Sequence, residues 1–241
     1  MPYIARCEGE FPYAGPLVLA GGRIAYPDMR SADRGVDDVL ILRSVGIPAG
    51  PVRAADIDPG RQFRAMGDAL LCQGCGGPSS RRPGSQARLW ALPVVEQGRQ
   101  VDPAGLCTES PPVCAHCVLG DMPRCPVMRP AHQLLWVSQA PVVGVMAILR
   151  PPPLGGGQTK PKFLRLPSDI EEEGRGGGAL DRARAEWDCA VAVSLVRKIV
   201  RYSPADPRHI ADLAAGSREQ PGNGLLPGPG TAGEIRGGGT R

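Results

Sequence analysis

Aromatic residues are scarce in this chain, at 4% of 241 residues, although apolar residues as a whole make up 42%. A hydrophobic core must then consist mainly of valine, leucine, isoleucine and alanine, and we expect it to be modest in size. Glycine and proline, with 33 and 27 residues, favour turns and coil over about a quarter of the chain. A bound metal ion would add stability that such a core lacks.

Strong net charge and long apolar segments are also missing. The formal charge is only +4, which is compatible with nucleic-acid binding but does not indicate it. The amino terminus lacks the charged and apolar regions of a signal peptide, and the longest apolar run, residues 140–149, is too short to cross a bilayer. We therefore expect a cytoplasmic protein that has no membrane partner.

Motifs of common enzyme classes are absent too. The glycine runs are not followed by the Lys-Ser/Thr of a phosphate-binding loop, and no G-x-S-x-G elbow occurs. The only histidines are His116, His132 and His209. An HNH-type nuclease needs a histidine base and further ligands between its cysteine pairs, and none of the three lies there. No small-molecule substrate is evident.

Two C-x-x-C pairs are the strongest chemical signal, since in a reducing compartment such pairs indicate metal binding rather than disulfides. The first pair is Cys72 and Cys75, in the sequence CQGCGG. Two residues between cysteines let both sulfurs of a tight turn face one ion. Gly74 and Gly76 suit this turn, because glycine accepts the left-handed conformation that often follows the second ligand. This pair predicts half of a zinc site.

The second pair, Cys114 and Cys117, follows PPV and is expected to open a short helix. Residues 76–113 separate the pairs, whereas a compact zinc ribbon has about 15 to 20 residues there. Lengthening a loop adds little closure entropy, so we predict one structural Zn²⁺ on all four cysteines. Cys107 and Cys125 bracket the second pair and are alternative ligands. A rubredoxin-like iron site and four unligated thiols are the other interpretations.

Local signals predict several elements in the first 150 residues. Residues 17–26 predict a hairpin around Gly21-Gly22, and residues 39–45 a strand. Asp58-Pro59 predicts an N-cap and the first turn of a helix that leads to Cys72. Residues 88–95 predict a strand beside the metal, and residues 132–149 predict two strands that form a second hairpin, interrupted at Ala140-Pro141.

The expected organisation is a β-rich zinc-binding domain over residues 1–150, a Pro/Gly-rich linker over 151–178, a helical segment over 179–216 and a disordered tail over 217–241. Within the helical segment, residues 181–202 predict one long helix that ends at Ser203-Pro204, and Asp206-Pro207 predicts a last short helix. The fold class is α+β, with small β-hairpins around a treble-clef or zinc-ribbon-like four-cysteine site and a separate carboxyl-terminal helix.

Four short motifs together carry a resemblance: the opening MPYI, the CQGCGG knuckle after a short helix, PPVCAHC, and RCP at residues 124–126. They resemble an uncharacterised family of actinobacterial cysteine-rich proteins over about residues 1–150. The resemblance implies a metal-bound fold and implies no activity.

The preferred functional hypothesis is a non-enzymatic, zinc-stabilised module that binds nucleic acid or protein. Arg81, Arg82, Arg88 and Arg99 lie near the cysteines in sequence and can meet phosphates. No set of aromatic residues for base stacking accompanies them, so a solvated surface in an arginine-rich chain is the preferred explanation for them. The alternatives are an HNH-like nuclease or a degenerate relative of one, and a structural component of a mobile element.

Overall fold

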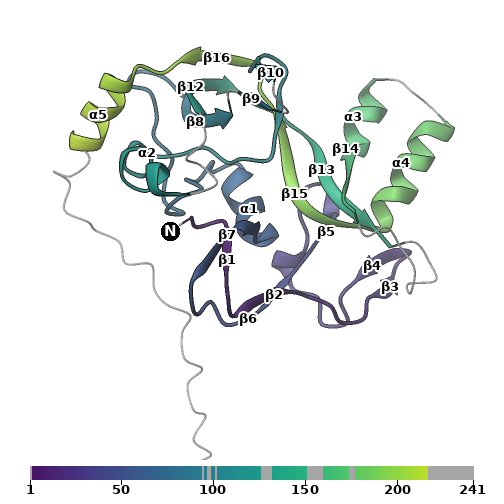
Figure 1. Cartoon of the computed structure of the whole chain (residues 1–241). Helices are drawn as coiled ribbons and strands as arrows, with labels where there is room; N and C mark the ends of the chain where they lie inside the picture. The colour runs from purple at the N-terminus through teal and green to yellow at the C-terminus, as the bar shows by residue number, and fades with distance from the viewer. Residues whose placement is uncertain are drawn as a thin grey trace, which may run out of the picture.

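The computed structural model describes residues 2–93, 95–96, 99–100, 102–125, 132–150, 160–173 and 177–216. Its fold is mixed α+β, with small sheets and a few helices (Figure 1). The first part of the chain contains β1 (Ala5–Cys7), β2 (Glu10–Pro12), β3 (Val18–Ala20), β4 (Arg23–Ala25), β5 (Leu40–Ile41), β6 (Ser44–Gly46), β7 (Val52–Ile57) and α1 (Pro59–Met66).

The middle contains β8 (Arg88–Pro93), β9 (Val95–Glu96), β10 (Arg99–Gln100), β11 (Cys107–Thr108), α2 (Ala115–Gly120), β12 (His132–Gln139) and β13 (Val142–Leu149). The last part contains β14 (Lys162–Arg165), α3 (Pro167–Glu172), α4 (Gly178–Asp188), β15 (Ala190–Lys198), β16 (Arg201–Pro204) and α5 (Pro207–Gly216). Three 3₁₀ turns span Ser31–Asp33, Val36–Asp38 and Met122–Arg124.

Two sheets form the centre of the fold, and all their strand pairs but one are antiparallel. One has the order β11-β15-β13-β14, with β5 added to β15 in parallel, and the other has the order β16-β12-β8. The main cluster of buried residues takes side chains from both sheets and from α1, including Trp90, Leu135, Val145, Leu195 and Phe63. The core therefore lies between the two sheets, and α1 closes one side of it.

A shared corner connects the two sheets. The amide of Lys198 donates to the carbonyl of Pro141 at 3.0 Å, and the amide of Val200 donates to that of Gln139 at 2.9 Å. The β13–β15 ladder thus continues into the β12–β16 ladder across the bend. The expected hairpin over residues 132–149 is wrong, because β12 and β13 pair with strands of different sheets. Pro141 has no amide hydrogen to continue a ladder, and the chain turns there.

The expected long helix over residues 181–202 is also wrong beyond Asp188. Its first half is α4, but residues 190–198 are strand β15, and β16 follows. β15 is buried along nearly its whole length and has β11 and β13 on its two edges. A continuous apolar run with β-branched valines suits a strand covered on both faces, and this tertiary setting overrides its helical propensity.

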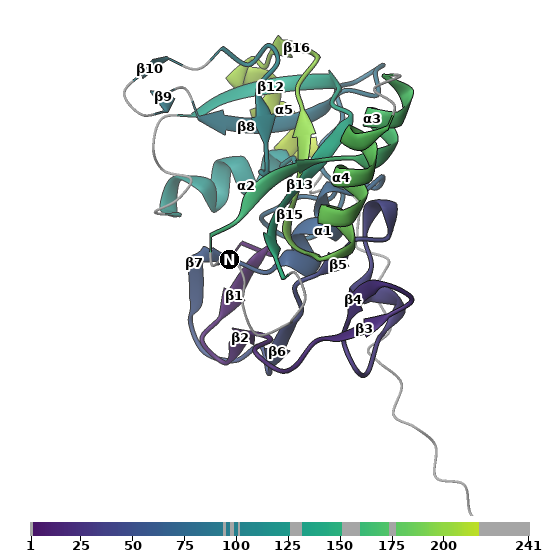
Figure 2. The ribbon, with the colours of Figure 1, turned by 90° about the vertical axis from the view of Figure 1, so that its right-hand side faces the viewer.

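The expected linker and separate carboxyl-terminal segment need correction as well. Residues 160–173 contain β14 and α3, and β14 pairs with β13. α3 and α4 lie side by side next to β14 (Figures 1 and 2). Because β15 is hydrogen-bonded to β13, residues on both sides of the expected boundary share one sheet and one core. The rest of the expected linker, residues 151–159 and 174–176, and the expected disordered tail lie outside the described residues.

Several local predictions are confirmed. β3 and β4 form a hairpin around Gly21 and Gly22, whose φ values are +59° and +83°. The carboxylate of Asp58 accepts a hydrogen bond from the amide of Arg61 at 2.7 Å and caps α1, and α5 begins at Pro207. The strand expected over residues 39–45 is divided into β5 and β6. No helix in the described part of the chain is long and apolar enough to span a membrane.

Removing the cap should weaken α1 measurably. We expect Asp58→Ala to lower the free energy of unfolding by about 1 kcal/mol, because an amide of the first turn loses its acceptor. Urea denaturation followed by circular dichroism measures this change. Asp212→Ala, at an exposed position of α5, is the control and should stay within about 0.5 kcal/mol of the parent. An equal loss in both variants would contradict the capping role.

Candidate metal centre

The four cysteines of the two C-x-x-C pairs converge. The Sγ atoms of Cys72, Cys75, Cys114 and Cys117 all lie within 4.8 Å of one another. The Sγ atoms of Cys75 and Cys114 are 3.9 Å apart. Tetrahedral zinc with Zn–S bonds of about 2.3 Å would place its sulfurs about 3.8 Å apart. The donor set therefore fits one tetrahedrally coordinated ion, as the sequence predicted.

Backbone hydrogen bonds close the first pair into a tight loop a few residues after α1. The amide of Gly76 donates to the carbonyl of Cys72 at 2.8 Å, and the amide of Cys72 donates to the carbonyl of Gly77 at 2.7 Å. Gly76 has φ +74°, the left-handed conformation expected after the second ligand. Gly74 is needed for a different reason. A Cβ atom there would lie 2.8 Å from Cys117 Sγ, so the close approach of the second pair requires glycine.

The second pair occupies the first turn of α2. Cys114 is the N-cap residue, and its Sγ accepts from the amide of Cys117 at 3.4 Å. Cys72 Sγ accepts from the amides of Gly74 at 3.3 Å and of Cys114 at 3.2 Å. Amide donors directed at sulfur stabilise thiolates and are common around bound metal ions. Amide donors at Cys72 and Cys114 thus favour the charged form of these two sulfurs.

The pKa values of the four thiols differ. Hydrogen bonds from the Cys114 and Cys117 thiols lower the pKa of Cys72 to about 7, and the same two partners hold the pKa of Cys75 well below its usual range. The pKa of Cys117 is raised, chiefly by its hydrogen bonds with Cys114 and Cys72. The pKa of Cys114 is raised as well, so Cys72 and Cys75 are the thiols that lose their protons first, and a metal ion would bind all four as thiolates.

Residues distant in sequence hold the two loops together. The amide of Gln73 donates to the carbonyl of Pro112 at 2.9 Å, and the amide of Val113 donates to that of Leu89 in β8 at 2.8 Å. The hydroxyl of Ser80 accepts from the amide of Ala115 at 2.9 Å. The long insert between the pairs therefore contains β8, and its last residues, before Cys114, pack against β8 and against the first cysteine loop.

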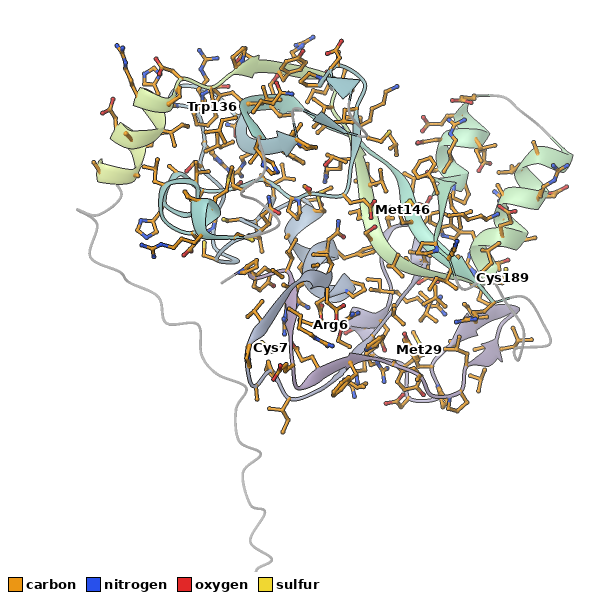
Figure 3. All side chains as sticks on the ribbon, in the orientation of Figure 1. Arg6, Cys7, Met29, Trp136, Met146 and Cys189 are labelled. Carbon is orange, nitrogen blue, oxygen red and sulfur yellow. The ribbon has the colours of Figure 1, made fainter. Side chains whose placement is uncertain are left out.

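A second cluster of buried residues supports the site from the outer face of the small sheet, which is the three-stranded sheet β16-β12-β8. It joins Cys72 and Cys117 to Trp136 of β12 and to Ile210 of α5. Trp136 lies beside α5 (Figure 3). Alternate residues of β8 and β12 face this cluster while their neighbours face the main core. The metal centre is therefore packed against the body of the protein.

The other cysteines lie elsewhere. Cys107 is exposed on β11, opposite Lys198, and half-buried Cys125 follows the turn after α2. Neither belongs to the cluster of four that the described residues form. Cys7 and Cys189 lie away from α2 (Figure 3), and burial raises the pKa of Cys189. The two alternative ligands that the sequence left open are thus not part of this site.

The histidines and arginines considered from the sequence are dispersed. His116 is exposed on α2, His132 begins β12 and His209 is exposed on α5. Within the described ranges, none of them belongs to a group of three or more side chains that could hold a metal ion. Arg81 and Arg82 are exposed, and Arg88 is half-buried and donates to the Ser79 carbonyl at 3.1 Å. The side chain of Arg99 lies outside the described residues.

Sequence reasoning missed the supporting residues. The amide of Tyr3 donates to the carbonyl of Gly74 at 2.7 Å, and a Cβ atom at Gly76 would lie 2.6 Å from the Tyr3 ring. Ser80 and Gln73 also connect the loops, as described above. Each of these contacts depends on segments distant in sequence, and a single sequence carries no signal for them.

No protein-family model, curated protein or solved structure matches the chain. The actinobacterial cysteine-rich family stays a prediction from the short motifs.

The close approach of Gly74 to Cys117 allows a specific prediction. Gly74→Ala should weaken metal binding by at least about tenfold, because the added methyl group collides with Cys117 Sγ. Competition with a chromogenic chelator measures the affinity. Gly77→Ala is the matched control in the same loop, where a Cβ atom would lie at an ordinary 3.6 Å from Cys75 Sγ. Equal affinities of the two variants would contradict the packing argument.

Proposed function

We propose that Cys72, Cys75, Cys114 and Cys117 hold one structural Zn²⁺ and that the protein is a non-enzymatic binding module. The observation that carries the metal assignment is the convergence of the four sulfurs within 4.8 Å. Four thiolates are a ligand set typical of structural zinc, and they leave no open coordination position for a substrate or water. The bound ion would therefore stabilise the fold rather than react.

The proposed site has a treble-clef-like arrangement. In such sites a glycine-containing knuckle supplies two ligands and the start of a helix supplies the other two. Here the loop around Gly74 and Gly76 and the first turn of α2 take these two roles. The insert between them is longer than in compact zinc ribbons and contributes β8 to the small sheet.

The partner class of this module is nucleic acid or protein. Exposed Arg81 and Arg82, in the loop between the knuckle and β8, favour a phosphate-bearing partner only weakly, since Arg82 also donates to the Ser203 hydroxyl at 3.2 Å. Binding through phosphates would weaken steeply as salt rises, because counterions are released. Salt-dependent retention on immobilised DNA or RNA therefore tests the nucleic-acid alternative directly.

Metal analysis tests the central claim. Protein purified without chelators should contain close to one zinc per chain by elemental analysis, and denaturation in the presence of a chelator should release it. Iron at the same stoichiometry would contradict the zinc assignment. A metal content near zero after reconstitution with Zn²⁺ would contradict the site itself. Divalent-dependent nicking of plasmid DNA would contradict the non-enzymatic assignment and favour the HNH-like alternative.

A further inference from the structure

An apolar cavity of about 280 Å³ lies directly beside the metal centre. One wall belongs to the centre itself, through Gly74 and Cys117. Most of the remaining wall is apolar and comes from the amino-terminal segment, β7 and the region of α2, including Ile4, Val52, Ala54, Ile57, Val118 and Met122. Asp121, Arg124 and Cys125 add polar groups where the chain leaves α2. Figure 1 shows that the chain's amino terminus, β1 and β7 face α2. Segments far apart in sequence thus form this cavity.

Gln73 gives the cavity a polar group without a partner. Gln73 lines this cavity and the neighbouring one and is only 6% exposed, yet its Nε2 has no hydrogen-bond partner among the described residues. The backbone of Gln73 is fully used, since its amide donates to Pro112 and its carbonyl accepts from Ile4. A buried amide without a partner is costly, and an acceptor on a bound ligand would satisfy it.

The side chains that line the cavity restrict the class of ligand that it can bind. The described residues that line the cavity include no aromatic ring, so they offer nothing on which a nucleobase can stack. The aliphatic wall suits a branched aliphatic group, and the Gln73 amide requires an acceptor such as a carbonyl. An extended peptide presents an aliphatic side chain and a carbonyl together.

The strand beside the cavity has room for such a peptide. β7 contributes Val52 and Ala54 to the wall, and in the described part of the chain its only strand partner is β1. The other edge of β7 therefore keeps backbone groups available for pairing. Peptides commonly bind by adding a strand to such an edge, with alternate side chains entering pockets.

We propose that this cavity is a peptide-recognition site, in which an aliphatic side chain of a protein partner enters beside the metal centre and a peptide carbonyl accepts a hydrogen bond from Gln73. This proposal rests on the binding-module function and names its partner class as protein. Zinc would fix the wall that Gly74 and Cys117 provide, so the site forms fully only in the metal-bound protein.

The test uses zinc-loaded full-length protein and the capped peptide acetyl-Val-Leu-Val-amide, with acetyl-Val-Gly-Val-amide and adenosine monophosphate as comparison probes. Binding is followed by ¹H–¹⁵N NMR at the side-chain amide of Gln73. The leucine peptide should bind in the millimolar range, as expected for a small ligand, and shift this signal. The glycine peptide should bind at least about tenfold more weakly. Absence of leucine-peptide binding, or preferential binding of the nucleotide, would overturn the proposal.

Gln73→Leu separates a binding role from a structural one. It should weaken peptide binding at least about tenfold and leave the zinc content and thermal midpoint unchanged or the midpoint raised, because a buried polar group without a partner disappears. Gln133→Leu is the matched control, since Gln133 Nε2 is also buried without a partner among the described residues but does not line this cavity. Equal peptide affinity in both variants would contradict the role of Gln73.

A second pair of variants locates the ligand. A neighbouring cavity of about 530 Å³ shares Gln73, Ile4, Ala54 and Ile57 with this one. Val52 lines the first cavity and not the second, whereas Ala55, on the same strand, lines the second and not the first. Val52→Trp should fill the site and abolish peptide binding, and Ala55→Trp should preserve it. The reverse result would place the peptide in the neighbouring cavity and overturn the assignment. Zinc content in each variant distinguishes loss of the peptide site from loss of the metal centre.

Discussion

Cys72→Ser should abolish stoichiometric zinc binding and lower the free energy of unfolding by at least about 5 kcal/mol. Structural zinc contributes about 10–16 kcal/mol in small zinc-finger peptides, and this chain has a modest core to compensate. Cys72 is fully buried and accepts two amide hydrogen bonds, so its position allows little adjustment. Metal analysis together with thermal denaturation measures both effects.

Cys114→Ser should lose zinc and stability as Cys72→Ser does, because both cysteines bind the same ion. Cys107→Ser is the matched control, since Cys107 is exposed and lies outside the cluster of four. It should keep one zinc per chain and the parental thermal midpoint. If Cys72→Ser and Cys114→Ser each retained a full complement of zinc, the claim of a shared site would be wrong.

Arg197→Leu should lower the free energy of unfolding by about 3 kcal/mol through the loss of hydrogen bonds to backbone carbonyls. Arg197 lies in β15 and is buried, and its guanidinium donates to the carbonyls of Met66 at 2.7 Å and of Ala140 at 2.6 Å. Burial lowers its pKa. These bonds join the end of α1 to the corner between the sheets, and leucine would leave both carbonyls without their donor.

Urea denaturation measures the effect of Arg197→Leu, with Arg201→Leu as the control at an exposed position of β16. Arg197→Lys should fall between the parent and the leucine variant, because one ammonium group cannot reproduce the geometry of the guanidinium fork. An unchanged unfolding midpoint for Arg197→Leu would mean that the Met66 and Ala140 carbonyls gain nothing from this side chain.

Local chemistry explains which parts of this structure could be predicted. Gly21-Gly22, Asp58-Pro59 and the C-x-x-C pairs each act within a few residues, and the structure places the hairpin, the helix start and the four sulfurs as expected. A glycine turn or an N-cap is specified by its own side chains, whatever surrounds it. The candidate metal ligands could therefore be found from sequence alone.

Secondary structure and strand pairing that depend on segments distant in sequence could not be predicted. Residues 190–198 have a helix-compatible composition, but their burial between β11 and β13 makes them a strand. The segments on either side of Pro141 look like the two arms of a hairpin, yet each pairs with a different sheet. Gln73 gave no sequence signal either, because its importance comes from a cavity formed by the amino terminus, β7 and α2.

The late position of β15 in the chain has a consequence for biosynthesis. β5 pairs with β15, and the Gln62 side chain of α1 hydrogen-bonds to Leu195 across a sequence separation of 133 residues. Closing so large a loop is slow, because its entropy is lost before the contacts form. On the ribosome, the cysteine pairs emerge well before β15, so the larger sheet can be completed only after β15 has followed them. Expression truncated at residue 150 should therefore give an aggregation-prone chain.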